Sequence, residues 1–164
     1  MIPLRDHHGN TVGFTARVLD PNDKPKYMNS PQTPIYDKGA LLYGLDLAKT
    51  PIKKQGEVVI VEGNLDLVAS HMAGVENVVA SSGTALTDRQ INLLKRYTNT
   101  LVFSFDTDAA GFEAARRGMR LASSMGCNVR VAVIPPELGK DPDDLVQKDP
   151  KLWQEVASRH IDKM

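Results

Sequence analysis

The stretch that decides the fold is Thr100-Leu-Val-Phe-Ser-Phe-Asp-Thr-Asp-Ala-Ala-Gly-Phe112. Its first part, residues 100–105, is apolar, aromatic, β-branched or small, which predicts a buried strand. Asp106 and Asp108 follow directly, and side chains two residues apart on an extended chain point the same way. If the extended conformation persists through Thr107, both carboxylates face one point beyond the carboxyl end of the strand. Open α/β sheets place their ligands at that end.

Two carboxylates that converge at a strand end repel each other unless a cation lies between them. Oxygen ligands of this kind suit Mg²⁺ or Mn²⁺. The alternative interpretation of an Asp-x-Asp pattern is a solvated loop in which the two aspartates cap a helix. The pattern taken alone favours neither interpretation.

Two further strand ends carry acidic residues. Segment 57–66 reads Glu-Val-Val-Ile-Val-Glu-Gly-Asn-Leu-Asp, an apolar strand followed by Glu62 and by a helical pattern that contains Asp66. An apolar strand at 129–134 precedes the third group, Asp141-Pro-Asp143-Asp-Leu. Three acidic strand ends within one α/β region argue for a shared metal site.

Length and composition fit one domain, or one domain with a smaller lobe, because the chain has 164 residues. The net charge is zero, but residues 1–54 hold eight Lys/Arg against five Asp/Glu, and residues 55–164 hold twelve against fifteen. This uneven distribution suits a polyanionic substrate. The single cysteine, Cys127, excludes a disulfide framework and a cysteine-based zinc site. Since no secretory or membrane-spanning apolar run is present, we expect a cytoplasmic protein without membrane contact.

The first third of the chain predicts a small lobe. Residues 1–20 read as a β-hairpin, in which Arg17 is interpreted as a solvated edge charge. Segment 21–38 contains four prolines, which preclude a regular helix. Its lysines, hydroxyls and tyrosine rings suit phosphates and bases, although composition alone favours an ordinary connection between lobes. We expect a short helix at 40–48 and a linker, with the lobe boundary, from Pro51 to Gly56.

From residue 57 onward strands alternate with helices, which predicts a parallel sheet with right-handed crossovers. Thr87 and Gln90 fit a capping box that opens one helix, and Gly74 and Gly126 fit helix ends. The expected strands are 57–61, 77–80, 100–105 and 128–134, and the expected helices are 64–73, 88–97, 109–125, 141–147 and 152–160.

At this point the motifs resemble a known family. Glu62-Gly-Asn-Leu-Asp66 followed by Asp106-Thr-Asp108-Ala-Ala-Gly resembles the Toprim domain, which topoisomerases, DnaG-type primases, old-family nucleases and recombination-repair proteins share. The stretch Lys26-Tyr-Met-Asn-Ser-Pro-Gln-Thr-Pro-Ile-Tyr-Asp-Lys38 is similar to the catalytic core of bacterial DnaG-type primases, as are Ser82-Gly-Thr-Ala and Asp141-Pro-Asp-Asp-Leu. The chain departs from the family pattern Glu-Gly-Tyr-Met-Asp at Asn64 and Leu65, and from the usual Gly or Ser at Thr107. No carboxylate is lost by these departures.

The resemblance implies synthesis of RNA primers on single-stranded DNA by metal-dependent nucleotidyl transfer, from ribonucleoside triphosphates. It implies a partial N-terminal basic lobe at 1–54, a Toprim domain at 55–148 and a C-terminal helix at 149–164. Catalytic roles fall to Glu62, Asp106 and Asp108. Mg²⁺ or Mn²⁺ would be held by these residues together with Asp66, Asp141 and Asp143. Nucleotide and nucleic-acid contacts fall to Arg17, Lys26, Tyr27, Asn29 and Lys38.

Further expectations concern partners and alternatives. We expect a monomer that contacts the template, the nascent RNA primer and, through a domain C-terminal to this chain, a replicative helicase. Zinc is expected only in an upstream module outside this chain, and the basic lobe is expected to extend before Met1. A Toprim nuclease would use the same acids to activate water. A third alternative is a chain that binds metal or nucleotide without turning over on its own.

Overall fold

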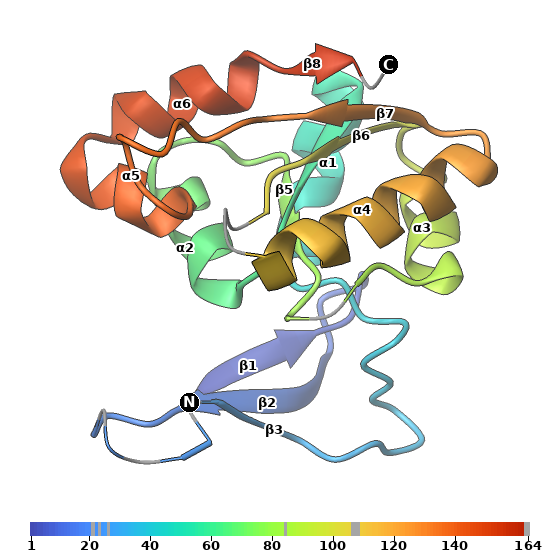
Figure 1. Ribbon diagram of the computed structural model, residues 1–164. Helices are drawn as coiled ribbons and strands as arrows, with labels where there is room; N and C mark the ends of the chain where they lie inside the picture. Colours follow the sequence, from blue (N-terminus) through green and yellow to red (C-terminus); the bar gives the residue numbers. More distant parts are fainter. Residues whose placement is uncertain (21, 23, 26, 84, 106–108, 163–164) are drawn as a thin grey trace.

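Two sheets form the structure, a small antiparallel one and a larger mixed one (Figure 1). The computed structural model describes residues 1–20, 22, 24–25, 27–83, 85–105 and 109–162. The small sheet has the order β1-β2-β3, with β1 (Ile2–Arg5), β2 (Thr11–Arg17) and β3 (Tyr27–Asn29). The expected hairpin is therefore confirmed. The third strand was not predicted, because residues 27–29 were interpreted as part of a loop.

The larger sheet has the order β5-β4-β6-β7-β8. Its first four strands run parallel, as expected, and the short last strand is antiparallel to β7. The bounds are β4 (Glu57–Val61), β5 (Val78–Ala80), β6 (Thr100–Phe103), β7 (Asn128–Val131) and β8 (Ile161–Asp162).

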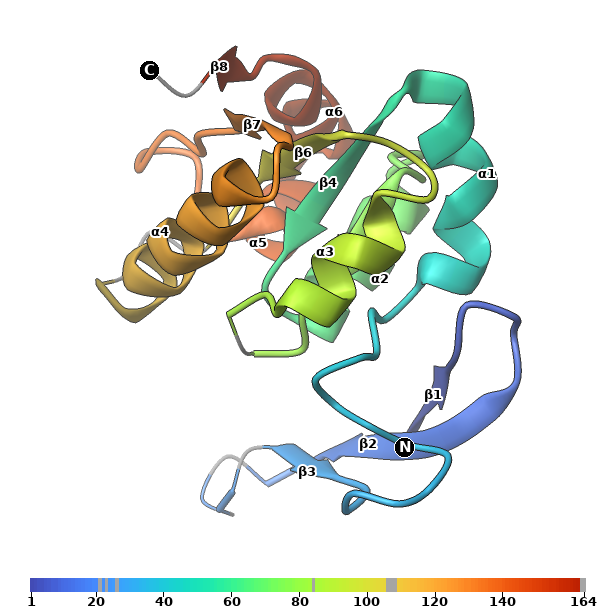
Figure 2. The ribbon, with the colours of Figure 1, turned by 90° about the vertical axis from the view of Figure 1, so that its right-hand side faces the viewer.

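Helices cover both faces of this sheet (Figure 2). Alternate residues of β4 explain why: Val58 and Ile60 pack on one face with α1, α3 and α4, whereas Val59 and Val61 pack on the other with α2, α5 and α6. A continuous apolar run is what a strand buried on both faces requires. The bounds are α1 (Leu45–Gln55), α2 (Asn64–Met72), α3 (Asp88–Leu94), α4 (Ala109–Ser124), α5 (Pro142–Lys148) and α6 (Pro150–Ser158).

The helix predicted at 40–48 is wrong in both bounds. Helix α1 begins at Leu45, after Gly44, and continues through the supposed linker to Gln55, with Pro51 inside it. Proline removes one helical hydrogen bond, but Ile52 beyond it is fully buried against the sheet, and this burial favours continuing the helix. The division of the chain near residue 54 into two domains stays a prediction.

The helix caps agree with the sequence. The Thr87 hydroxyl accepts the Gln90 amide, and the Gln90 side chain accepts the Thr87 amide in return. Gly74 and Gly126 follow α2 and α4 with φ of 80° and 79°. Within the described part of the chain, no helix is both long and apolar enough to cross a membrane.

Residue 44 must be glycine because of both its backbone angle and the side chain beside it. Its φ is +80°, and a Cβ built there would lie 2.4 Å from Leu67 Cδ1 of α2. We expect Gly44→Ala to lower the free energy of unfolding by about 2–4 kcal/mol, from the left-handed backbone and the steric overlap together. Urea unfolding measures this loss. Gly56→Ala is the matched control, because Gly56 has φ +76° but open space around its Cβ, and it should lose only about 1–2 kcal/mol. Equal losses would contradict the close approach of α1 to α2.

Candidate active site

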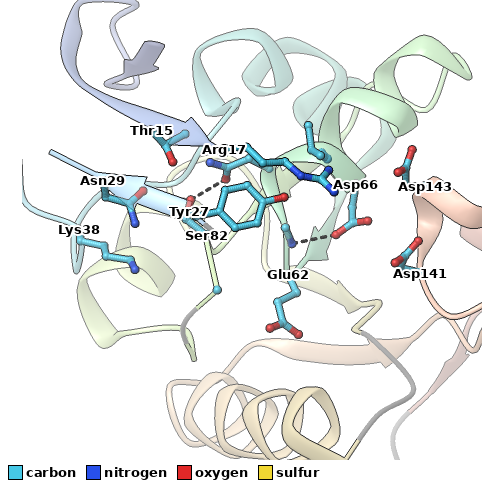
Figure 3. A pocket seen from close by; sticks show the side chains of 14 residues that line it. Thr15, Arg17, Tyr27, Asn29, Lys38, Glu62, Asp66, Ser82, Asp141 and Asp143 are labelled. Atoms are coloured by element: carbon cyan, nitrogen blue, oxygen red, sulfur yellow. Dashed lines mark hydrogen bonds between the residues drawn. The ribbon is translucent and has the colours of Figure 1, made fainter. Parts of the chain in front are cut away.

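A cavity of about 470 Å³ lies between the small sheet and the carboxyl ends of β4 and β5 (Figure 3). Basic and amide side chains approach it from the small sheet and the loop that follows β3, and carboxylates approach it from the loops and helix starts beside the larger sheet. The lining residues are Thr15, Arg17, Tyr27, Asn29, Lys38, Glu62, Gly63, Asn64, Leu65, Asp66, Ser82, Gly83, Asp141 and Asp143.

Eight of the eleven residues predicted for the site line this cavity, namely Arg17, Tyr27, Asn29, Lys38, Glu62, Asp66, Asp141 and Asp143. Three others, Lys26, Asp106 and Asp108, lie outside the described residues. The structure therefore brings together every predicted site residue that it describes, and the chemical roles of all eleven stay predictions.

Strand pairing explains the basic side of the cavity. In the antiparallel pair β2–β3, Thr15 lies opposite Asn29 and Arg17 lies opposite Tyr27. Directly opposed residues share a face of the sheet, and so do residues two apart on one strand. All four side chains therefore reach the same face. The Arg17 guanidinium lies 5.8 Å from the centroid of the Tyr27 ring, a cation–π contact. Arg17 is thus exposed, as predicted, but it lines the site as well as the sheet edge.

The acidic side begins at the end of β4. The Gly63 amide donates to Asp66 Oδ2 at 2.9 Å, which closes the first turn of α2. A Cβ at residue 63 would lie 2.6 Å from that oxygen, so glycine is needed here for space and not for its backbone angle. Asp66 is consequently held in place by the loop that follows Glu62. The Glu62 carboxylate points away from the Asp66 carboxylate in Figure 3.

The third acidic group reaches the cavity through the packing of α5 against α2. Asp141 caps α5 by accepting the Asp144 amide at 2.8 Å, and Asp143 lies in the first turn. Burial raises the pKa of the Asp141 carboxyl, and the negative charges of Asp144 and Asp143 raise this pKa further, against the lowering effect of the cap hydrogen bond. A nearby cation would offset these costs of the charged form.

The described carboxylates fit a divalent cation in chemistry but do not complete a site. Among the described residues, no three Asp, Glu, His or Cys side chains gather closely enough to hold a metal ion. The next strand of the sheet, β6, is parallel to β4, and Phe103 pairs with Ile60, two residues before Glu62. The predicted ligands Asp106 and Asp108 follow β6 in the sequence. A complete ligand set therefore requires residues beyond those described.

Three polar residues that shape the site were not among its predicted residues, although Ser82 and Asn64 belong to the motifs described above. Thr15 lies on the face shared by Arg17 and Asn29. Ser82 has φ 59°, an unusual angle for a serine, and its hydroxyl donates to Asn64 Oδ1 at 2.7 Å. Asn64 is only 8% exposed, which gives the departure from the family pattern at this position a structural role. The alternation of β2 would have identified Thr15, whereas the Ser82–Asn64 bond joins segments that the sequence does not connect.

The segment that carries Lys38 is held by the start of α3. The Thr87 hydroxyl donates to Gly39 O at 2.6 Å, and the Gln90 side-chain amide donates to Leu41 O at 2.6 Å and to Lys38 O at 3.4 Å. An ion pair joins Asp37, next to Lys38, to Arg89. The same capping box that opens α3 therefore fixes the loop that brings Lys38 to the cavity.

Two segments of the chain match described protein families, and whole proteins match most of its length. Residues 59–146 match the family described as Toprim-like, and residues 1–49 match the N-terminal domain of the DNA primase catalytic core. The DNA primase of Halalkalibacterium halodurans is 46% identical over 148 residues, which cover 90% of this chain and 24% of that protein. That of Clostridium acetobutylicum is 45% identical over 153 residues, covering 92% and 25%. The chain thus spans about a quarter of the length of these relatives.

Solved structures are similar over almost the whole chain. The Aquifex aeolicus primase, with its zinc-binding and RNA polymerase domains, has a TM-score of 0.87 and 36% identity, covering 98% of this chain and 40% of that one. The RNA polymerase domain of Mycobacterium tuberculosis primase DnaG has a TM-score of 0.86 and 36% identity, covering 98% and 54%. A DnaG primase catalytic domain bound to single-stranded DNA has a TM-score of 0.84 and 38% identity, covering 98% and 51%.

The fold and the cavity together show the class of protein, a Toprim-like α/β domain whose acidic strand ends face a small sheet with basic side chains. The matches across both segments then define the family, and the chain belongs to the bacterial DnaG-type DNA primases.

Gln90 tests the contact between α3 and the Lys38 segment. It is fully buried, and Gln90→Leu would leave the Lys38 and Leu41 carbonyls without their donor and Thr87 without its cap partner. We expect a loss of about 2–3 kcal/mol in the free energy of unfolding and faster amide hydrogen exchange in residues 37–41. Gln90→Glu is the control, since it keeps the cap acceptor but loses both donors. It should loosen 37–41 while leaving the start of α3 protected. Unchanged exchange in 37–41 for both variants would contradict the assigned contacts.

The half-buried carboxyl of Asp141 predicts a pH effect. Because its pKa is raised above the ordinary 3.8 in the folded state, the folded chain binds this proton more tightly than the unfolded chain does. Its contribution to stability therefore falls as the pH rises through 3.8 toward the folded-state pKa and stays lower above it. Asp141→Asn keeps a good cap without a charge. Its Tm relative to wild type should rise across this window and remain higher at neutral pH, measured in EDTA.

Asp149→Asn is the matched control for that measurement, because Asp149 caps α6 at an exposed position. It shows how the same Asp→Asn substitution changes the Tm at a position that is not buried. If the Tm of the wild type instead rises relative to that of Asp141→Asn as the pH increases, burial does not disfavour the charged form of Asp141.

Proposed function

We propose that this chain is the part of a DNA primase that performs nucleotidyl transfer, joining ribonucleotides into short RNA primers on a single-stranded DNA template for replication. The observation that carries the proposal is the cavity itself, which has cations and amides on one wall and carboxylates on the other. A triphosphate with its counter-ion needs both walls at once. Relatives named DNA primase and a similar catalytic domain bound to single-stranded DNA support the same reaction.

In the proposed reaction the primer 3′-hydroxyl attacks the α-phosphate of a ribonucleoside triphosphate, and pyrophosphate leaves. Arg17 and Lys38 bind phosphate oxygens, and Asn29 supplies an amide donor beside them. The Tyr27 ring, held under Arg17, offers a surface for a base. Glu62 either accepts the proton of the attacking hydroxyl or serves as a further ligand.

Asp106 and Asp108, with Glu62, Asp66, Asp141 and Asp143, are the residues proposed to hold Mg²⁺ or Mn²⁺. When bound, such an ion lowers the pKa of the hydroxyl and offsets the charge that develops on the phosphates. The residues of the chain contribute the rest: Gly63 fixes Asp66, the cap of α5 fixes Asp141, and α3 fixes the segment that carries Lys38.

The longer protein would contribute further functions. A zinc-binding module upstream and a helicase-binding domain downstream are proposed from the family, and the chain itself is proposed to act as a monomer.

Titration of a ribonucleoside triphosphate, with and without Mn²⁺, tests the proposal on wild type, Asp108→Ala and Lys38→Ala. We expect metal-dependent binding that weakens about tenfold or more in both variants, because each loses a charged contact to the phosphates or their ion. Lys151→Ala, at an exposed lysine on α6, is the control and should bind normally. In primer synthesis by the complete primase, Asp108→Ala should cost on the order of 10²-fold or more in rate.

Two outcomes would overturn the proposal. Hydrolysis of DNA that is indifferent to Lys38→Ala would favour a Toprim nuclease. Near-normal primer synthesis by Asp108→Ala would remove the acidic cluster from the chemistry.

A further inference from the structure

Two neutral side chains of the cavity form a hydrogen-bonded pair that has no role in the proposed reaction so far. The Ser82 hydroxyl donates to Asn64 Oδ1 at 2.7 Å, and both residues line the cavity. A dashed line marks this bond at the labelled Ser82 in Figure 3. We call the two residues the Asn64–Ser82 pair. It joins the start of α2 to the segment that follows β5.

The bond between the two side chains fixes how each of them can bind a ligand. Because Asn64 Oδ1 accepts the serine proton, the amide nitrogen Nδ2 keeps both of its protons for other acceptors. Among the described residues, none accepts a hydrogen bond from this nitrogen. The Ser82 oxygen donates its one proton to Asn64 and keeps lone pairs that can accept. The pair therefore presents a donor beside an acceptor.

Both residues are unfavourable to the folded chain unless a ligand binds them. Asn64 is only 8% exposed, and an amide donor that is mostly buried without a partner lowers stability. Ser82 has a φ of 59°, in the left-handed region that serine rarely adopts. The amide of the next residue, Gly83, donates to Glu62 O at 3.0 Å and holds this loop beside the end of β4. Such strain in a cavity is typical of a site that binds a ligand.

A donor beside an acceptor matches a hydroxyl better than it matches a phosphate. A hydroxyl can accept from Asn64 Nδ2 and donate to Ser82 Oγ at the same time. A phosphate oxygen only accepts, so it would face the serine lone pairs with no proton between them. The cavity offers Arg17 and Lys38 to phosphates instead. The hydroxyls of a nucleotide belong to its sugar.

We propose that the Asn64–Ser82 pair binds the 2′-hydroxyl of the incoming nucleotide and thereby selects ribonucleotides over deoxyribonucleotides. The 2′-hydroxyl is the group that distinguishes the two sugars. That the ligand is a nucleotide rests on the proposed function, whereas the donor and the acceptor are features of the structure. Because Asn64 stands where the family pattern has tyrosine, this contact is a property of this chain and not of the family.

Titration of ATP, 2′-deoxy-ATP and 3′-deoxy-ATP with Mn²⁺ tests the pair, because each deoxy ligand lacks one hydroxyl. The variants are Asn64→Leu and Ser82→Ala. Leucine has nearly the shape of asparagine without its polar atoms, and alanine carries the same left-handed backbone cost as serine. Ser124→Ala is the matched control, since Ser124 is exposed at the end of α4 and donates to Leu121 O in the same helix. Urea unfolding checks that each variant is folded.

We expect the wild type and Ser124→Ala to bind ATP about tenfold more tightly than 2′-deoxy-ATP, because the deoxy ligand leaves the pair without its hydroxyl. In Asn64→Leu and in Ser82→Ala this ratio should fall to about two or less, through weaker binding of ATP alone. The affinity of the wild type for 3′-deoxy-ATP should stay close to that for ATP. In the complete primase, both variants should incorporate deoxyribonucleotides into primers more readily than the wild type does.

The outcomes separate this inference from the proposed function. Equal binding of ATP and 2′-deoxy-ATP by the wild type would overturn the inference, and the proposed function would stand if binding still required Mn²⁺ and Lys38. An equal loss of both ligands in Asn64→Leu and Ser82→Ala would also overturn it, because the pair would then shape the cavity or contact the base. Discrimination against 3′-deoxy-ATP that depends on Asn64 would overturn the assignment to the 2′-hydroxyl. A wild type that binds none of the three nucleotides would overturn both proposals.

Discussion

The burial of β4 on both faces is the constraint on which the rest of this structure depends. Its apolar run lies between β5 and β6 in a parallel arrangement, and helices cover it from both sides. Parallel strands end at the same edge of a sheet, so the polar residues that follow each strand meet there. Glu62 and Asp66 reach the cavity because they follow β4 at this edge of the sheet. The chemistry of the site is thus a consequence of how the core is packed.

The site also requires that the two sheets keep a fixed relation. The hydrogen bonds from Thr87 and Gln90 to residues 39 and 41 join the start of α3 to the segment that carries Lys38. Lys49, on α1, which packs on the larger sheet, donates to His7 O in the turn of the small sheet. Because Gln90 is fully buried, its donors have no access to water as an alternative partner. The segment that carries Lys38 is therefore positioned by α3, a helix that packs on the larger sheet.

The residues around the acidic side of the cavity lower the stability of the folded chain. Asp141 is disfavoured in its charged form by burial and by neighbouring carboxylates, and Ser82 adopts an unfavourable backbone angle beside Asn64. Strain and unfavourable charge are common where a protein binds a ligand that offsets them. Here the hydrogen bonds of helix starts, at Gly63 and Asp144, hold the carboxylates in position without neutralising them.

The sequence by itself determined the parallel sheet, the capping box of α3 and the acids at the strand ends, because these follow from local alternation and from short-range hydrogen bonds. Asp106 and Asp108 stay a prediction on that basis. Only the tertiary structure decided that β3 pairs with β2, which places Thr15 and Asn29 beside Arg17 and Tyr27. It also decided that α1 runs through Pro51 and that Gln90 holds a distant loop. The apolar periodicity of a segment indicates which of its faces are buried. It does not indicate which other segment covers those faces, because that segment lies elsewhere in the chain.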